Sequence, residues 1–173
     1  MFLRTLPLLL AITASLAAHS VQAATTGTLT FRGQVNAGTC NLAAGDVNRT
    51  ITLPTVKVSN FDAANEVGVQ SFDLTADCES DIRTVSFLFT GTPATGNGAL
   101  FANTGTSTGT ALSLSHRNVA YIPANGTAAQ RTRQVATSGQ KAVLPMNASY
   151  FKNGTLVKSG TLVSVVTVAI TYN

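Results

Sequence analysis

The chain has 173 residues, of which 45% are hydrophobic and only 10% are charged, and its formal net charge is +4. Its basic residues are scattered, with Arg131 and Arg133 as the one close pair, so there is no basic patch of the kind that binds nucleic acid. The length suits one domain with a hydrophobic core.

The first 23 residues are expected to be a cleaved export signal. Arg4 precedes an apolar run over residues 6–16, and Val21-Gln22-Ala23 places small side chains where a signal peptidase cleaves. The run is shorter than the roughly 20 apolar residues of a membrane-spanning helix. We therefore expect cleavage after Ala23, and removing 23 of the 173 residues leaves 150.

Residues 27–36 are predicted to form the opening strand. Leu29 and Phe31 would lie on one face, with polar residues between them, as in a half-buried strand. A free terminal strand with this alternation is costly to leave exposed, because it can pair with any open sheet edge. The pattern fits the first strand of a closed sandwich, and it also fits a strand that covers another chain's core.

Strand patterns recur along the rest of the chain, whereas long helical patterns are lacking. Residues 60–66 could hold one helical turn, and residues 91–109 read as a loop pinned at residues 99–101. Asn153-Gly154 is the strongest hairpin signal, placed before the last strand. Strands or extended pieces are predicted at residues 51–58, 67–78, 83–90, 111–115, 119–122, 140–151 and 161–173.

Several of these segments have an apolar face. The faces comprise Phe72, Leu74, Ala76 and Cys78; Val85, Phe87 and Phe89; Leu144, Met146, Ala148 and Tyr150; and Val166, Val168, Ile170 and Tyr172. About eight short strands separated by turn signals indicate an antiparallel β-sandwich. Because the last face runs on to Tyr172, we expect the final strand to be docked on the body.

Cys40 and Cys78 follow an export signal, so one intramolecular disulfide is the economical interpretation. A metal site would need more ligands, since His116 is the one histidine after the signal, and a catalytic thiol lacks a partner. We expect neither a metal nor a cofactor.

Two other groups of residues have side chains that could carry chemistry. Asp77, Glu79 and Asp81 surround the second cysteine, but their spacing fits no calcium loop, and a solvated turn explains them better. His116 follows nearby serines, but neither an orienting acid nor an oxyanion site accompanies them. We therefore expect that the protein is not an enzyme.

Four stretches together resemble the pilins of chaperone–usher, type 1-like fimbriae. They are Gly-Thr-Leu-Thr-Phe-Arg-Gly-Gln-Val at 27–35 followed by Cys40, Phe-Asp-Leu-Thr-Ala-Asp-Cys at 72–78, Leu-Pro-Met-Asn-Ala-Ser-Tyr-Phe at 144–151, and Val-Ala-Ile-Thr-Tyr-Asn at 168–173. Their order and spacing behind an export signal carry the resemblance, which covers nearly the whole chain. Residues 91–133 contribute nothing specific to it.

The resemblance implies an incomplete immunoglobulin-like β-sandwich that lacks its final strand. A strand from a periplasmic chaperone, and then from another subunit, would complete it. The implied division is a signal at 1–23, a donor-strand extension at 24–33 and a pilin domain at 34–173. The implied donor residues are Gly27, Leu29, Phe31 and Gly33, and the implied groove and chaperone-binding residues are Val166, Val168, Ile170, Tyr172 and Asn173.

The function implied is that of a structural subunit of an adhesive fimbria, exported through the periplasm to the cell surface. Its partners would be copies of itself or related pilins, a chaperone and an outer-membrane usher, with no nucleic acid and no small-molecule substrate. The alternative is a secreted sandwich that binds a glycan or receptor as a monomer. The absence of Trp and the presence of only three Tyr give that alternative little support.

Overall fold

The computed structural model describes residues 26–173. The expected signal peptide and cleavage site lie outside the described residues. By its internal contacts the chain divides into a unit that ends at Val35 and a unit that spans Asn36–Asn173.

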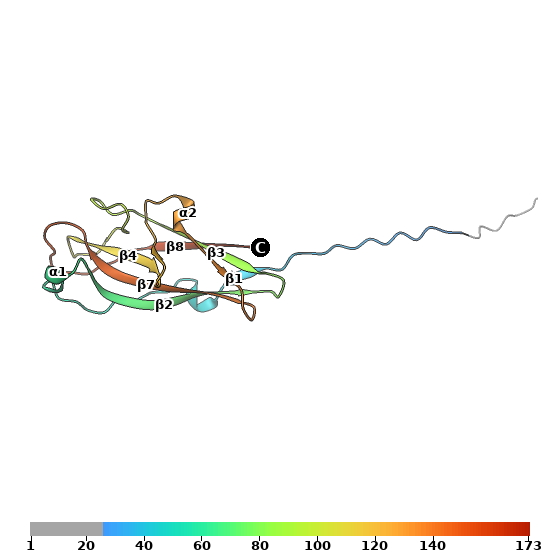
Figure 1. Cartoon of the computed structure of the whole chain (residues 1–173), viewed down its shortest axis with the longest axis horizontal. Coiled ribbons are helices and arrows are strands. Elements are labelled where there is room, and N and C mark those ends of the chain that lie inside the picture. The colour runs from blue at the N-terminus through green and yellow to red at the C-terminus, as the bar shows by residue number, and fades with distance from the viewer. Residues whose placement is uncertain (1–25) are drawn as a thin grey trace, which may run out of the picture. The chain divides into compact units, whose positions relative to one another are not determined.

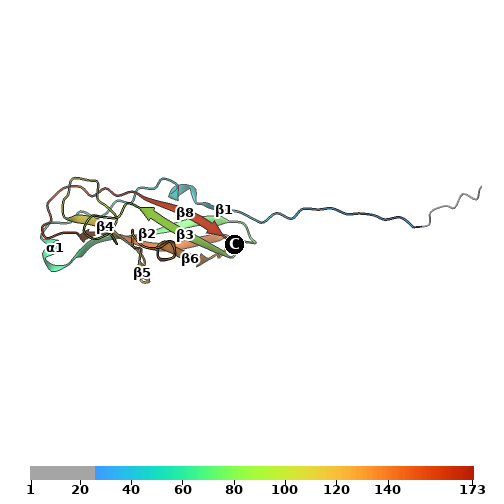
Figure 2. The ribbon, with the colours of Figure 1, turned by 90° about the horizontal axis from the view of Figure 1, so that it is seen from above.

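The larger unit is built from two antiparallel sheets (Figures 1 and 2). One sheet has the strand order β1-β2-β7-β4-β5, and the other has the order β6-β3-β8. The all-β sandwich expected from the sequence is therefore confirmed. The strands are β1 Cys40–Leu42, β2 Glu66–Cys78, β3 Thr84–Gly91, β4 Thr110–His116, β5 Ala120–Tyr121, β6 Thr132–Ala136, β7 Lys141–Lys152 and β8 Val166–Tyr172.

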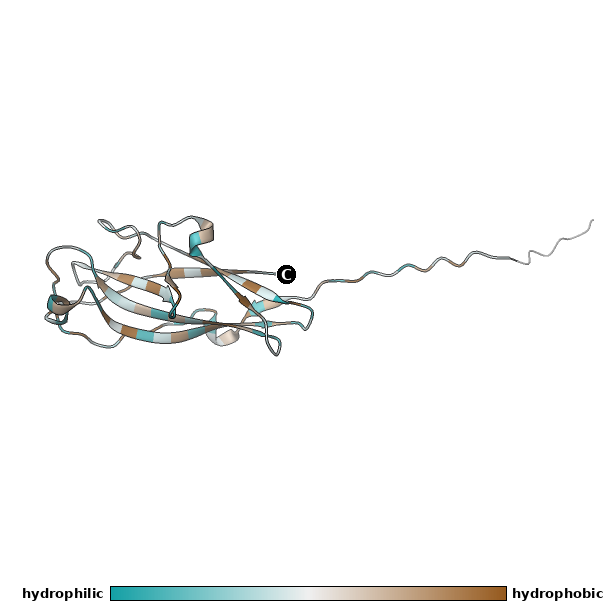
Figure 3. Ribbon diagram, in the orientation of Figure 1, coloured by the Kyte–Doolittle hydropathy of each residue, from teal (hydrophilic) through white to brown (hydrophobic). Residues whose placement is uncertain are grey.

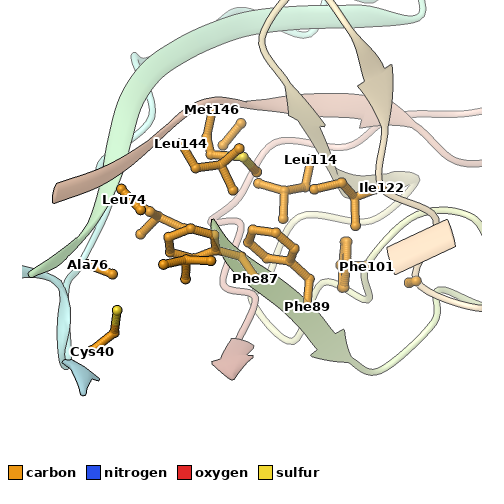
Figure 4. Close-up of a cluster of buried hydrophobic side chains, with 14 of the residues drawn as sticks. Cys40, Leu74, Ala76, Phe87, Phe89, Phe101, Leu114, Ile122, Leu144 and Met146 are labelled. Atoms are coloured by element: carbon orange, nitrogen blue, oxygen red, sulfur yellow. The ribbon is translucent and has the colours of Figure 1, made fainter. Parts of the chain in front are cut away.

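The core forms where the inward faces of the two sheets meet. Hydropathy alternates along β2 and β7, as Figure 3 shows, because successive strand residues point to opposite faces. Figure 4 shows Phe87 and Phe89 of β3 directed toward side chains of β2, β4 and β7. Phe87 is fully buried, as are Leu144 and Met146. The core faces predicted for residues 72–78, 83–90 and 140–151 are confirmed.

The predicted disulfide is present. β1 pairs with the end of β2, and this register places Cys40 directly opposite Cys78. Their sulfur atoms are 2.05 Å apart, and both residues are buried at the margin of the core. The bond therefore fixes the short edge strand β1 to the longest strand of its sheet.

Two small predictions for the loops also hold. α1, Asn60–Ala63, is the single helical turn expected within residues 60–66. Leu100 and Phe101 are buried, and Phe101 forms isolated bridges with Pro93 and Leu112. Neither α-helix within residues 26–173 has the length or apolar composition of a membrane span.

Three expectations about strands are wrong. Residues 27–36 do not form the opening strand, because the first strand of the described chain is Cys40–Leu42. The last strand begins at Val166 rather than near residue 161, and residues 51–58, expected as a short extended piece, lie outside the sheets. Asn153-Gly154 does not close a hairpin, because β7 and β8 belong to different sheets.

The structure adds elements that the sequence did not indicate: β1, the 3-10 helix Ala44–Asp46, β6 and the four-residue helix α2, Ala128–Arg131. The Thr127 side chain accepts a hydrogen bond from the Gln130 backbone, and the Gln130 side chain accepts one from the Thr127 backbone, which is a capping box. Arg131 then donates to the backbone oxygen of Phe89, which ties α2 to the neighbouring strand β3.

Candidate functional site: an open sheet edge

Among residues 26–173, β8 pairs with β3 alone, so its other edge has no partner. β3 is the centre of this three-stranded sheet, with β6 on one side and β8 on the other. β1, the edge of the opposite sheet, contacts β8. The sandwich is thus open along the side where a seven-residue strand faces a three-residue strand.

The backbone of β8 alternates between paired and open residues. Asn173 donates to the Thr84 oxygen, and the Thr84 backbone donates back to Asn173, both at 3.2 Å. In an antiparallel ladder such pairs recur at every second residue. Thr167, Ala169 and Thr171 therefore direct their N–H and C=O groups toward β3. The alternate residues of β8, Val166, Val168, Ile170 and Tyr172, direct theirs toward the open edge.

The side chains of those alternate residues point inward but are incompletely covered. Val166, Val168 and Ile170 pack against the core and are only half-buried, whereas Phe87 on the neighbouring strand is fully buried. Tyr172 is 41% exposed. An apolar row with open backbone groups on the same residues is an acceptor for an added strand.

Three more leucines share this half-buried state on the same core. They are Leu42 in β1, Leu53 in the segment that follows it, and Leu162 in the approach to β8. The sequence predicted one wall of the site, since β8 has a regular alternation. It did not single out these leucines as part of the site, although Leu53 and Leu162 lie in segments predicted to be extended.

The N-terminal unit supplies the complementary feature. Leu29 and Phe31 are 82% and 88% exposed, and Val35 is 98% exposed. No atom lies within 4 Å of where a side chain would begin at Gly27 or Gly33. Residues 27–35 therefore carry alternate apolar side chains that the described chain leaves in solvent.

Asn173 is held at the end of β8. Its backbone oxygen accepts hydrogen bonds from the amides of Arg83 at 2.9 Å and Thr84 at 3.2 Å. Its side chain also pairs with the Thr84 hydroxyl, and the residue itself is exposed. The end of β8 is therefore docked, as the sequence predicted, and still accessible from outside.

The acidic residues around Cys78 have structural partners. Asp77 forms a salt bridge with Lys141, and Asp81 accepts a hydrogen bond from the Gly38 backbone at 2.8 Å. Glu79 accepts one from the Thr39 hydroxyl. Within residues 26–173 no group of His, Cys, Asp and Glu side chains is arranged to hold a metal ion.

His116 ends β4, where it pairs with Ala120 of β5 and Met146 of β7. Burial lowers the pKa of His116, and the nearby positive charge of Arg133 lowers it further. Ser113 is buried opposite Ser149, in the middle of the sheet. These positions are explained by the packing of β4.

Comparison with known proteins identifies the family of this sandwich. Residues 29–173 match the family described as Fimbrial protein. The chain belongs to the fimbrial protein family. The match begins at Leu29, so it includes most of the exposed segment as well as the domain.

Curated relatives from this family are similar over part of their length. The minor fimbrial subunit HifD of Haemophilus influenzae is 32% identical over 123 residues, which cover 69% of this chain and 53% of HifD. The fimbrial subunit ElfA of Escherichia coli strain K12 is 31% identical over 99 residues, covering 55% of each chain. The chain spans about half the length of the curated relatives it matches.

Solved structures of fimbrial subunits share the fold. The P pilus rod subunit PapA is 17% identical with a TM-score of 0.62, and the match covers 78% of this chain and 99% of PapA. A subunit of a chaperone–usher pilus, solved to explain rod uncoiling, is 20% identical with a TM-score of 0.64. That match covers 87% of this fimbrial protein and 98% of the other chain.

Proposed function

We propose that this protein is a structural subunit of a chaperone–usher fimbria that polymerises by donor-strand exchange. Its N-terminal extension, residues 24–33, enters the open edge of a second copy or of a related subunit. Its own edge at β8 receives the extension of another subunit. Each subunit is then both donor and acceptor, which allows an unbranched fibre to grow.

The observation that carries this proposal is the state of β8. Its inward side chains at Val166, Val168 and Ile170 are half-buried on the core, and the same residues have backbone groups that face the open edge. One added strand would pair those groups and cover those side chains in a single step. A domain that closed its own sandwich would not leave its core in this state.

The extension has the composition to fill this edge. Leu29 and Phe31 lie two residues apart and would both point to the acceptor core in an extended conformation. Burying each of these side chains is worth roughly 1.5–3 kcal/mol. Gly27 and Gly33, at the same spacing on either side, would let the strand pass where the acceptor core comes close to the backbone.

The same edge explains the need for a chaperone. An unpaired seven-residue edge with a half-covered core is prone to aggregate, so it needs a temporary partner during export. We propose that a periplasmic chaperone pairs with β8 and contacts Asn173, and that an outer-membrane usher exchanges it for the next extension. The assembled subunit would then reside in a fimbria at the cell surface.

Deletion of the extension tests the proposal. The full mature chain should form ladders of SDS-resistant polymers, whereas a chain lacking residues 24–32 should accept a donor but fail to donate. A synthetic peptide of residues 24–35 should bind the truncated chain and form a 1:1 complex. Polymers of normal length from the truncated chain would refute the donor role.

A further inference from the structure

We propose that successive subunits also meet through oppositely charged ends of the domain, with Glu79 and Asp81 of the donor facing lysines of the acceptor. This inference rests on the proposed function, because it concerns the contact that forms once the extension is in place. It assigns a second interaction surface, outside the strand-binding edge, whose partner is a second copy of this chain.

One end of the domain, here called the acidic end, surrounds the residues from which the extension leaves. The Glu79 amide donates to the Thr39 oxygen at 2.9 Å, and Asp81 holds the Gly38 amide. β8 also ends here, because the Arg83 amide donates a hydrogen bond to the backbone oxygen of Asn173. Figures 1 and 2 place the C-terminus at the end opposite α1.

The opposite end, here called the lysine end, gathers the segments around α1 and the start of β8. The Lys152 amide donates to the Asn65 oxygen, and the Lys158 amide donates to the Thr108 oxygen. Lys57 lies three residues before the start of α1, and its backbone oxygen accepts a hydrogen bond from the Asn60 backbone. Lys57 and Lys158 are exposed, and Lys152 is half-buried.

The two ends therefore differ in charge. The lysine end carries Lys57, Lys152 and Lys158 against Asp62 and Glu66, since Glu66 pairs with Phe151 next to Lys152. At the acidic end, Asp77 is paired with Lys141, which leaves Glu79 and Asp81 against Arg83. The salt bridges recorded within residues 26–173 involve none of Glu79, Asp81 and the three lysines. These charges are thus available to a second molecule.

Chain length brings the two ends together. If a donor strand runs antiparallel to β8, the C-terminal end of the extension leaves the groove on the side of Val166, toward the lysine end of the acceptor. Residues 36–39 then span at most about 14 Å to the donor's own domain. The donor's acidic end would then lie near the acceptor's lysine end, within reach of roughly one to two Debye lengths of about 8–10 Å each.

The charges also select this direction of the donor strand. A parallel strand would bring the donor's acidic end to the end of β8, where Glu79 and Asp81 of the acceptor lie. Like charges would then meet, whereas the antiparallel arrangement pairs opposite charges. The contact would therefore speed correct encounters between subunits and disfavour reversed ones.

Charge reversals test the contact through the rate at which the full mature chain forms SDS-resistant polymers. At about 20 mM salt, Glu79→Lys and Lys158→Glu should each slow polymerisation about 2- to 10-fold, as expected for exposed pairs converted to repulsive ones. The double variant Glu79→Lys/Lys158→Glu should return to within about twofold of the original rate, because the pair is restored. At about 500 mM salt the differences should disappear.

Asp62→Lys is the matched control, since it changes the net charge as Glu79→Lys does but adds to the lysine end. It should leave the rate unchanged or raise it. A second control is a capped peptide of residues 24–35 with Arg32→Gln, which has no domain and should bind every variant equally fast.

Two results would overturn the inference: single reversals that behave like Asp62→Lys, or a double variant slower than both singles. In either case, polymerisation of the original chain and binding of the peptide would leave the proposed function intact. Failure of the original chain to polymerise, together with failure of the peptide to bind, would instead refute the proposed function.

Discussion

Phe31 should contribute to attachment without contributing to the stability of its own domain. Its side chain is 88% exposed in the free chain, so Phe31→Ala and Phe31→Asp should change the free energy of unfolding by less than about 0.5 kcal/mol. Inside an acceptor groove the same side chain would be buried. Phe31→Ala should then lose roughly 1.5–3 kcal/mol of binding, which corresponds to about a 10- to 150-fold faster loss of the donor.

Phe31→Asp should have a larger effect, because an aspartate would enter an apolar groove without a partner for its charge. The assay combines urea unfolding of the free chain with the dissociation rate of peptides of residues 24–35 that carry each substitution. Thr30→Asp is the matched control, since residue 30 would point away from the core in the same strand. Equal effects of Thr30→Asp and Phe31→Asp on dissociation would refute the alternation on which the donor role rests.

Further substitutions separate the groove, the core and the disulfide. Ile170→Asp should both destabilise the domain and abolish peptide binding, because Ile170 packs on the core at the open edge; normal peptide binding by a folded variant would contradict this. Phe87→Ala should cost about 3–5 kcal/mol in urea unfolding, since Phe87 is fully buried; a loss below 1 kcal/mol would show that the core is not packed as described. Replacing Cys40 and Cys78 by Ser should cost on the order of 4 kcal/mol in the same measurement, because the cysteines are 38 residues apart and the bond restricts the unfolded chain; an unchanged urea midpoint would argue against the bond. The pKa of His116 is lowered in the folded state, so the folded protein binds fewer protons at this residue than the unfolded chain does. The free energy of unfolding should therefore fall, with a shallow slope, as the pH drops from about 7.5 through the folded pKa. The slope should flatten in His116→Gln, and an identical slope in that variant would contradict the assignment.

The sequence predicted the sheets best where burial on one face sets the alternation of residues. β2, β3 and β7 are long strands that cross the core, so every second residue must be apolar. The sequence does not indicate β6, because a five-residue strand at a sheet edge shows little alternation of apolar and polar residues. Arg131 precedes this strand and Arg133 lies within it, which weakens the pattern further. The hairpin predicted at Asn153-Gly154 is wrong, because the residues of a turn do not reveal which sheet the next strand joins.

The candidate site was predicted in part for a similar reason. The apolar row on β8 can be read from the sequence, but its exposure depends on what lies beside it, which only the fold reveals. The extension alternates like a strand, although residues 26–39 form none in the isolated chain. A strand needs a partner for its backbone, and we propose that this partner is in another molecule.

Residue-resolved hydrogen exchange in β8 tests the central claim most directly. In the free domain the amides of Thr167, Ala169 and Thr171 should be protected by β3, whereas those of Val166, Val168, Ile170 and Tyr172 should exchange rapidly. Addition of the peptide of residues 24–35 should protect the second set and leave the first set nearly unchanged. Rapid exchange of Val168 and Ile170 in the presence of saturating bound peptide would contradict the account, because the strand would then be bound somewhere other than the open edge.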